Sequence, residues 1–419
     1  MTLKPPPLRN DCFALPAGVA WTPVDEALAL LRARLSVVVP VETRPLGAAL
    51  GRVLAADVIA LRSNPPQANS AVDGYGFAGA VAEGAHVMPL AKGRAAAGVP
   101  FDGVLPAGRA LRVLTGAALP EGVETVILEE DVTLGSGEIA FRGPLKAGAN
   151  TRRAGEDVAA GAVALTKGTR IGAPELALLA AVGVREVDTY RPLRVAVLST
   201  GDELVEAGSG GAGPGQIFDA NRPMLMAMLA AFGCEAVDMG RVPDDRSVLR
   251  AVLDDASARA DAILTSGGAS AGDEDHVSAL LREAGAMTEW RVALKPGRPL
   301  ALGLWNGAPV FGLPGNPVAA MVCTLIFARP ALGLLGGAGW AAPQGFDVPA
   351  GFEKRKKPGR REYLRARMRE GRAEVFKSEG SGRISGLSWA EGLVELPDGE
   401  AHIRPGDPVR FLPYGSFGL

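Results

Sequence analysis

From Pro192 to about residue 336, the sequence alternates short apolar segments with amphipathic segments of helical spacing. This alternation constrains the segment to an α/β architecture, with a mostly parallel sheet and helices on both faces. The expected strands are 194–198, 236–239, 261–264, 291–294 and 309–313. The expected helices are 222–232, 246–259 with Asp245 as its cap, 276–283, and one that starts after Pro317.

Three glycine-containing loops, 265–276, 294–299 and 312–317, each follow one of these expected strands. In an α/β sheet, loops at the carboxyl ends of strands line the crevice where ligands bind. Glycines let backbone N–H groups approach an anion, cationic side chains add charge-assisted bonds, and clustered carboxylates favour a hard divalent cation. The loops therefore predict a metal-assisted site for a phosphorylated or oxyanionic substrate.

The rest of the chain divides by composition. At 419 residues it is long enough for roughly three domains of about 150 residues. A helix is expected over Thr22–Val39, with Thr22 as N-cap and Pro23 at N1, and another between Gly172 and Gly183. A small all-β module is expected between Ser63 and Leu145. Beyond Gly337 helices are expected to stop, and strands are predicted at 361–369, 374–377, 393–396 and 409–412.

The overall charge and the cysteines exclude several classes of protein. A formal charge of −2 gives no general attraction to nucleic acid or to anionic membranes. Cys12, Cys234 and Cys323 are widely spaced, which suggests neither a disulfide framework nor a zinc site and suits a reducing cytosol. The proline-rich residues 1–20 lack the apolar core of a signal peptide, and no uninterrupted apolar run approaches the ~18 residues of a membrane span. A soluble cytoplasmic protein with a poorly ordered leader is expected.

Two acidic segments are candidate metal ligands. Asp202 and Glu203 follow the first α/β strand and could hold Mg²⁺ directly or through water, unless Asp202 only caps a turn. The second segment is 273–275, where Asp275 is the preferred ligand; acidic residues at a helix start are also favoured by the helix dipole alone. His276 is expected to be solvated or structural.

Two loops supply candidate anion contacts. Lys295 and Arg298 lie three residues apart across a Pro-Gly turn, so both side chains can reach one anion, although a solvated surface turn is the simpler alternative. In the loop 312–317, Gly315 and Asn316-Pro317 also suit a purely structural strand-to-helix turn.

Three further motifs are weak taken singly. Asp73 lies in a polar turn over 67–77, and Thr115 follows a strand pattern. Asp-Gly is a common hairpin turn, so neither motif alone indicates chemistry. The segment 150–157 combines acidic and basic residues that could equally form an interdomain salt-bridge cluster; they are Arg152, Arg153, Glu156 and Asp157.

A basic run from Phe352 to Arg372 contains ten Lys or Arg residues and three Glu. It has too few aromatic residues for a nucleic-acid stacking surface. The alternation over 361–369 predicts a half-buried strand, with Leu364, Ala366 and Met368 facing inward and Arg365, Arg367 and Arg369 on the solvent side. A phosphate or pterin-phosphate contact from one or two arginines is the functional alternative.

Taken together and in this order, the motifs resemble the molybdopterin molybdenumtransferase family, whose animal member is the C-terminal domain of gephyrin. The motifs are NSAVDGY, RVLTGAALPEG, NTRRAGED, STGDEL, SGGAS with GDEDH, LKPGRP and GLPGNP. The resemblance implies an elongated, four-lobed homodimer. Its lobes are a mixed helical lobe (21–62 and 146–190), an inserted β lobe (63–145), a three-layer α/β molybdopterin-binding lobe (191–336) and a C-terminal β-barrel-like lobe (337–419).

The reaction that the resemblance implies is insertion of molybdate into adenylylated molybdopterin, with Mg²⁺-dependent cleavage of the pyrophosphate link and release of AMP. A molybdopterin-adenylylating protein and cofactor-receiving enzymes are the implied partners, with no nucleic acid or membrane. The implied catalytic residues are Asp73, Thr115, Asp157, Glu203, Asp275, Lys295 and Arg298, and the implied metal ligands are Glu203, Asp244 (or its neighbour Asp245) and Asp275. The implied substrate contacts are Ser266, Gly267, Gly268, Ser270, Pro314, Gly315, Asn316, Pro317, Arg360 and Ser381.

Three positions depart from the family pattern: Ala68 replaces a frequent Asp, Arg298 a Lys, and Glu391 an Asn. Arginine keeps the charge at 298 but presents a planar fork, so the geometry at an anion changes. Besides the enzyme, a scaffold and a molybdopterin carrier or adenylylating protein are open alternatives. The short leader disfavours a scaffold, and the additional lobes disfavour a bare adenylylating protein.

Overall fold

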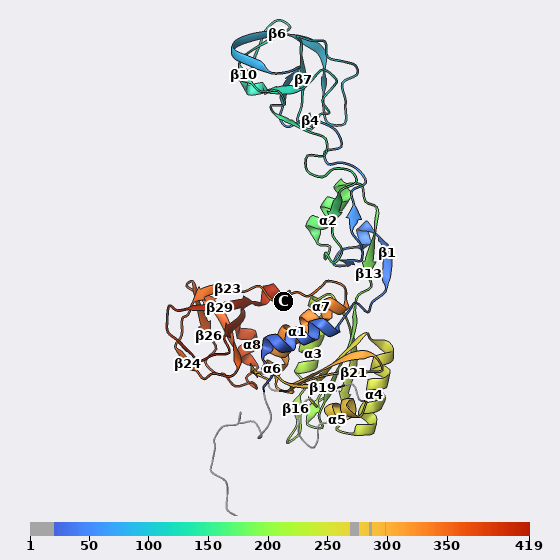
Figure 1. Cartoon of the computed structure of the whole chain (residues 1–419), viewed down its shortest axis with the longest axis vertical. Helices are drawn as coiled ribbons and strands as arrows, with labels where there is room; N and C mark the ends of the chain where they lie inside the picture. Colours follow the sequence, from blue (N-terminus) through green and yellow to red (C-terminus); the bar gives the residue numbers. More distant parts are fainter. Residues whose placement is uncertain (1–20, 269–275, 285–286, 298) are drawn as a thin grey trace, which may run out of the picture. The chain divides into compact units, whose positions relative to one another are not determined.

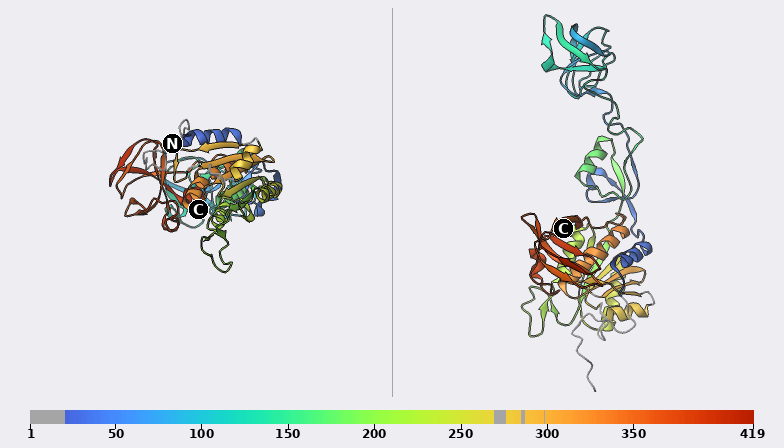
Figure 2. Two further views of the ribbon diagram at one scale, coloured as in Figure 1. Left: turned by 90° about the horizontal axis from the view of Figure 1, so that it is seen from below. Right: turned by 60° about the vertical axis from the view of Figure 1, so that its left-hand side comes forward.

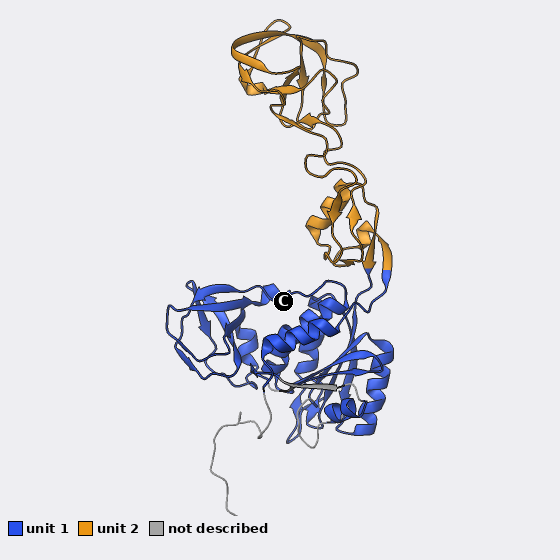
Figure 3. Ribbon diagram, viewed as in Figure 1, with its two compact units in different colours: residues 1–41, 190–419 blue, residues 42–189 orange. Residues whose placement is uncertain are grey.

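A computed structural model describes residues 21–268, 276–284, 287–297 and 299–419 (Figure 1). The chain splits into two compact units. Residues 42–189 form one, and residues up to 41 together with 190–419 form the other (Figure 3). The leader expected over 1–20 and the acidic segment 273–275 lie outside the described residues.

The larger unit contains the predicted α/β sheet, with strand order β17-β14-β18-β22-β21-β19. Four neighbouring strands are parallel: β17 (Glu235–Val242), β14 (Arg194–Thr200), β18 (Ala262–Ser266) and β22 (Ala308–Leu313). Two antiparallel pairings extend the sheet through β21 (Pro299–Trp305) and β19 (Met287–Arg291). The mostly parallel architecture is confirmed. The sequence does not predict β21, because this short run starts at a proline and contains Gly303.

Helices cover both faces of this sheet (Figure 2). On one face, α4 (Arg246–Arg259) and α5 (His276–Glu283) bury Leu249, Leu253 and Leu280 against Leu198 and Ile263. Both helices have the predicted bounds, and the Asp245 carboxylate caps α4 by accepting bonds from the Ser247 and Val248 N–H groups. Because side chains alternate along a strand, the buried Val195 and Val197 face the other way, where α3 (Asn221–Ala231) and α6 (Pro317–Cys323) pack.

Helix α6 continues through a π-helical turn, η3 (Thr324–Ala328), into α7 (Arg329–Leu335). The continuous helix Pro317–Leu335 has 19 residues, a mean hydropathy of 2.0 in its most apolar window, and 83% of that window buried inside the fold. Its length and composition would suit a membrane span, but its burial is that of a core helix. Arg329 interrupts the apolar run, which is why the sequence predicts no span there.

The first helix, α1, is shorter than predicted and spans Val24–Arg34. Pro23 is the N-cap rather than N1, because Thr22 instead forms a β-bridge with Val292 and its carbonyl accepts from the Ala293 N–H at 2.8 Å. The chain then leaves the helix before three consecutive valines and a proline, residues that disfavour helical backbone.

The C-terminal part of this unit is a second sheet with strand order β20-β25-β27-β29-β23. Its core contains Leu364, Ala366 and Val394, with Met368 packed against it, as the alternation predicts. Its strands are β20 (Leu294–Lys295), β23 (Phe346–Pro349), β25 (Arg361–Arg369), β27 (Gly392–Leu396) and β29 (Pro408–Pro413), and β26 (Arg372–Val375) pairs with β25. Strands β24 (Lys354–Lys356) and β28 (Ala401–Ile403) form a separate two-stranded sheet, and η4 (Tyr414–Phe417) follows β29. A short helix, α8 (Ser385–Trp389), contradicts the prediction that helices stop beyond Gly337.

Strand β20 shows that the predicted strand 291–294 is wrong. Residues 291–294 are not one strand of the α/β sheet, because β19 ends at Arg291 and β20 pairs in parallel with β25 of the C-terminal sheet. Leu294 faces Arg361 and Lys295 faces Glu362 in that register. Lys295 therefore belongs to the C-terminal sheet by its hydrogen bonding.

The smaller unit contains the predicted β module, a sheet with order β8-β5-β7-β6-β10-β9. Its strands are β5 (Gly74–Phe77), β6 (Val81–Ala95), β7 (Ala110–Val113), β8 (Thr125–Leu128), β9 (Thr133–Leu134) and β10 (Glu138–Leu145), with η2 (Glu129–Asp131). The rest of the unit comprises α2 (Ala173–Ala181), η1 (Leu46–Ala48), β1 (Val41–Pro45), β2 (Val53–Leu54), β3 (Val58–Ile59), β4 (Asn69–Ser70), β11 (Thr151–Arg152), β12 (Val163–Leu165) and β13 (Glu186–Tyr190). Helix α2 lies where the sequence predicts it, with Gly183 in the left-handed region at φ +82°.

Candidate functional site

The carboxyl ends of β14, β18 and β22 lie side by side, and glycines follow β18 and β22. This place, where the sequence predicts a ligand-binding crevice, is called the glycine crevice below. Gly267 and Gly268 have φ of +91° and +67°, and a Cβ on Gly267 would stand 2.8 Å from the Thr200 carbonyl oxygen. A Cβ on Gly268 would stand 2.6 Å from a methyl group of Val277. Gly315, after β22, lies beside Gly267. Gly267 and Gly268 are therefore required by their positive φ and by the close approach of Thr200 and Val277.

Asn221, which the sequence analysis does not single out, ties two of these loops together. Its side-chain amide donates to the Ser266 hydroxyl at 2.8 Å and to the Gly315 carbonyl at 2.7 Å. The buried Asp219 carboxylate fixes the start of α3 by accepting from the Asn221 and Arg222 N–H groups, both at 3.1 Å. An Asp followed two residues later by Asn at a helix start is the only sequence signal for this arrangement.

Two of the predicted acidic residues lie side by side at the ends of β14 and β17. The Asp202 carboxylate accepts from the Asp244 N–H, and the Asp244 carboxylate accepts from the Asp202 N–H, both at 3.3 Å. Glu203 is exposed and its carboxylate folds back over Gly201. Asp245 is committed to capping α4, and its bond from Ser247 lowers the pKa of its carboxyl, so Asp244 is the better placed of the two alternatives. Within the described ranges no three metal-ligating side chains come together; Asp275 and Ser270 lie outside them.

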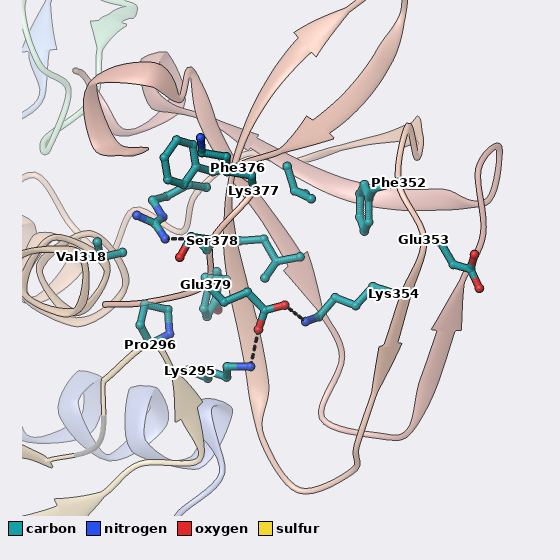
Figure 4. A pocket seen from close by; sticks show the side chains of 14 residues that line it. Lys295, Pro296, Val318, Phe352, Glu353, Lys354, Phe376, Lys377, Ser378 and Glu379 are labelled. Carbon is teal, nitrogen blue, oxygen red and sulfur yellow. Dashed lines mark hydrogen bonds and ion pairs between the residues drawn. The ribbon is translucent and has the colours of Figure 1, made fainter. Parts of the chain in front are cut away.

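Lys295, Lys354, Glu362 and Glu379 form a charged cluster. Figure 4 shows the bonds of Glu379 to both lysines. The Lys295 Nζ lies 2.6 Å from Glu379 and 3.4 Å from Glu362, and the Lys354 Nζ lies 3.1 Å from Glu362 and bonds to Glu379. Burial alone would lower the pKa of Lys354, but Glu379 and Glu362 raise it. Burial would likewise raise the pKa of Glu379, but the bonds from both lysines lower it. These opposite shifts favour the charged forms of both Lys354 and Glu379. Arg298 lies outside the described residues.

This cluster borders a cavity of about 220 Å³ between β20, β25, β26 and the start of α6. The aromatic side chains of Phe352, Phe376 and Tyr363 line it together with Val318 and Lys377. The sequence does not predict the cavity, because its walls come from segments up to 84 residues apart, as in the pair Lys295 and Glu379.

Arg365 also lines the cavity, and its predicted solvent-facing orientation is wrong. Its side chain is buried, and the guanidinium donates to the carbonyls of Arg383 at 2.5 Å, Gly380 at 3.2 Å, and Ser378. Burial lowers its pKa, and its charge stacks on the Phe376 ring at 4.9 Å from the centroid. In the described part of the chain it forms no salt bridge, so its charge is balanced only by carbonyl dipoles. An alternating pattern shows which face Arg365 occupies but not that a loop covers that face.

The loop held by Arg365 docks on α6. The Ser381 carbonyl accepts from the Val318 N–H at 3.1 Å, which satisfies one of the unpaired donors at the helix start. Asn316 is the N-cap but makes no side-chain cap bond, Pro317 is at N1 as predicted, and Pro314 is buried. The predicted Arg360 lies against Trp21, with 6.0 Å between guanidinium and ring centroid, and is not among the cavity-lining residues.

Most other cations of the basic run are paired within the fold instead of forming a solvated strip. Arg361 binds Asp25 and Asp398, each at 2.8 Å, and Lys356 is buried against the carbonyls of Lys357 and Gly399, each at 2.9 Å. Glu391, where the family pattern has Asn, pairs with Arg369 at 2.8 Å. These interactions stabilise the C-terminal sheet. The cations that line the cavity are Lys295, Lys354, Arg365 and Lys377.

In the smaller unit, Asp73 and Thr115 are brought together although 42 residues separate them. One Asp73 oxygen accepts both from the Thr115 hydroxyl and from its N–H, each at 2.6 Å. Asp157 accepts from the Asn64 amide at 2.9 Å, and Glu156 accepts from the Arg153 N–H at 2.8 Å. The salt-bridge cluster suggested for 150–157 is not found among the described residues.

The bond from the Thr115 hydroxyl is the largest cause that lowers the pKa of Asp73. We expect Thr115→Val to raise the pKa of Asp73 toward its ordinary value, because the carboxylate loses one of its two donors. An NMR titration of the Asp73 carboxyl carbon measures this shift. Thr133→Val, on exposed β9 of the same module, is the control and leaves the titration unchanged. An unchanged Asp73 pKa in Thr115→Val would show that the hydroxyl does not stabilise the carboxylate.

Comparison with known families covers most of the chain. Residues 22–183 match the MoeA N-terminal region (domain I and II), residues 196–333 a probable molybdopterin binding domain, and residues 347–414 the MoeA C-terminal region (domain IV). The molybdopterin molybdenumtransferase of Haemophilus influenzae is 35% identical over 93% of this chain and 98% of its own length. Dictyostelium discoideum gephyrin is 30% identical over 94% of this chain and 62% of its own length.

Among solved structures, the molybdopterin biosynthesis moeA protein of Pyrococcus horikoshii matches with a TM-score of 0.82 at 29% identity, covering 94% of this chain and 100% of that one. The three matched regions follow one another in the order that the motifs predict, and they include the crevice, the acidic strand ends and the cavity. The chain belongs to the molybdopterin molybdenumtransferase family.

Proposed function

We propose that this protein inserts molybdate into adenylylated molybdopterin, with cleavage of the pyrophosphate link and release of AMP. The observation that carries the proposal is the loop 312–318, which joins the glycine crevice to the cationic cavity. Gly315 lies beside Gly267 in the crevice, and three residues later Val318 lines the cavity and is bound by Ser381. A substrate with phosphates and an oxyanion could therefore contact both places at once.

Each part has a distinct chemical role in this proposal. The crevice glycines allow a phosphate-bearing ligand to approach the backbone closely. Lys295 holds molybdate or phosphate oxygens, and Arg298, expected on the same loop, is proposed to do the same. As the P–O bond of the pyrophosphate link breaks, negative charge grows on the AMP phosphate, and fixed cations stabilise it without reorganisation.

Mg²⁺ suits the acidic strand ends. Asp202 and Asp244 each accept a long backbone bond of 3.3 Å, and Asp202 also lies 3.8 Å from the Arg241 guanidinium, so carboxylate lone pairs remain for a hard cation. Glu203 and Asp244 would hold Mg²⁺, and Asp275 is proposed as a further ligand. When bound, the ion would offset the charge of the pyrophosphate oxygens.

The remaining proposals concern the oligomeric state, the location and the partners of the protein. We infer a homodimer in the cytoplasm, to which Asp73, Thr115 and Asp157 of the smaller unit contribute active-site groups. A molybdopterin-adenylylating protein would supply the substrate, and cofactor-dependent enzymes would receive the product. The alternative is a molybdopterin-binding carrier or scaffold without turnover.

The purified protein, given adenylylated molybdopterin, Mg²⁺ and molybdate, is expected to release AMP in proportion to the molybdenum-loaded cofactor formed. Chromatographic measurement of AMP and metal analysis of the released cofactor check this. Tight binding of the adenylylated compound with no AMP release would assign the protein to the carrier class.

A further inference from the structure

We propose that the Glu379 carboxylate occupies the oxyanion position between Lys295 and Lys354, and that the cavity binds a tetrahedral oxyanion by exchanging it for this side chain, with Lys354 as the second cationic ligand. This inference rests on the proposed function of the same site. It assigns roles to two residues that neither the motifs nor the matched family regions single out.

The two carboxylates of the cluster differ in burial. The Glu362 side chain is 9% exposed and comes from β25, which lies between β20 and β27, whereas Glu379 is 46% exposed and comes from a loop. Glu362 contacts both lysines, at 3.4 Å and 3.1 Å, without help from Glu379. Glu362 is therefore the permanent partner of the lysines, and Glu379 is the member that can leave.

The charges left after Glu379 leaves favour an anion. Lys295 and Lys354 then share the single carboxylate of Glu362, and the buried Arg365 adds a cation that has no salt bridge among the described residues. Uncompensated cations in a partly buried site are costly, so the site stays stable only when a negative group fills it. In the unliganded chain, Glu379 supplies this negative group. A tetrahedral oxyanion would replace it and offers more acceptor oxygens to the cations than a carboxylate does.

The backbone around Glu379 allows exchange by rotation of the side chain alone. Arg365 holds the carbonyls on both sides of it, those of Ser378 and Gly380, and the Ser381 carbonyl is fixed to α6. The loop therefore keeps its place when the carboxylate swings toward solvent. At about 30 Å³ for each water, the cavity of about 220 Å³ has room for roughly seven waters, which is ample for a tetrahedral oxyanion.

The test measures binding of molybdate alone to the full chain by equilibrium dialysis. Glu379→Gln keeps the shape but removes the competing charge, and we expect it to bind molybdate about tenfold more tightly. Glu374→Gln is the matched control, because Glu374 pairs with Arg367 in the same sheet and is 43% exposed, close to Glu379. The control is expected to bind as the unaltered chain does. Unchanged or weaker binding in Glu379→Gln, or equal tightening in the control, overturns the exchange.

Lys354 is tested in the same assay. Lys354→Met is expected to weaken molybdate binding about tenfold, and Lys354→Arg to restore most of it because the charge returns. Wild-type affinity in Lys354→Met overturns its role as a ligand. If Lys354→Met fails to fold, molybdate binding to Lys354→Arg is measured at increasing salt concentration instead. The affinity is expected to fall, because salt screens an ionic contact.

Failure of this proposal is distinguishable from failure of the proposed function. With adenylylated molybdopterin present, Glu379→Gln is expected to lower the molybdate concentration for half-maximal AMP release without raising the maximal rate. AMP release by the unaltered chain combined with unchanged binding in Glu379→Gln contradicts only the exchange. Tighter molybdate binding in Glu379→Gln combined with no AMP release from any variant contradicts only the proposed function.

Discussion

Lys295→Met is expected to lower the rate of AMP release about 100-fold or more. The Lys295 side chain extends from β20, an outer strand of the C-terminal sheet, and lines the cavity. It contacts both carboxylates of the cluster, Glu362 and Glu379. Removing one fixed donor from a site that stabilises developing negative charge commonly costs a factor of 10² to 10³ in rate. Without Lys295, the two carboxylates of Glu362 and Glu379 are balanced by only one lysine of the cluster, Lys354. The excess negative charge then repels an incoming anion.

Lys357→Met provides the comparison for this prediction. Lys357 is an exposed lysine of the same basic run and does not line the cavity, so its loss changes net charge by the same amount. We expect this variant to release AMP at the rate of the unaltered chain. If the Lys295→Met enzyme kept more than a third of normal activity, Lys295 would not be a catalytic residue.

Arg365→Met is expected to lower the free energy of unfolding of the larger unit by about 3 kcal/mol. Arg365 is 4% exposed, and its guanidinium donates to three loop carbonyls. Each buried polar group left without a partner costs about 1–3 kcal/mol. Methionine fills part of the space but offers no donor. Urea unfolding followed by tryptophan fluorescence measures the change, since Trp389 lies on the adjacent helix α8.

Arg372→Met, at the exposed start of β26, is the control for the stability measurement. Its effect is expected to stay within about 0.5 kcal/mol, as for most surface substitutions. Because Arg365 also supplies a positive charge at the cavity, Arg365→Met is expected to weaken molybdate binding as well. A loss of stability below about 1 kcal/mol would mean that water replaces the guanidinium, and Arg365 would then not organise the loop.

Local patterns were sufficient to predict much of the larger unit. The parallel core of the sheet, both helices on one face and the Asp245 cap follow from apolar spacing and from a single capping residue, which act over a few neighbouring positions. The glycines of the crevice were also predictable in position, since positive φ and close backbone approach restrict the choice of residue.

The cavity and its charged cluster could not be predicted in the same way. Lys295 pairs with β25 because its strand leaves the α/β sheet, and nothing in the residues nearest to it indicates that change of partner. Arg365 and Glu379 meet the cavity through a loop whose course depends on long-range contacts. The family resemblance implies Arg360 as a substrate contact, and that prediction stays untested. The placement of Arg365 at the cavity could not be predicted, because it depends on the loop that covers its face of the strand.

A crystal structure of the protein soaked with molybdate, with the molybdenum located by its anomalous scattering, would show directly where the oxyanion binds. We expect a peak in the cavity, in contact with Lys295 and Lys354, with the Glu379 side chain turned away from both lysines. A peak elsewhere in the chain, with Glu379 still bonded to both lysines, would contradict this expectation.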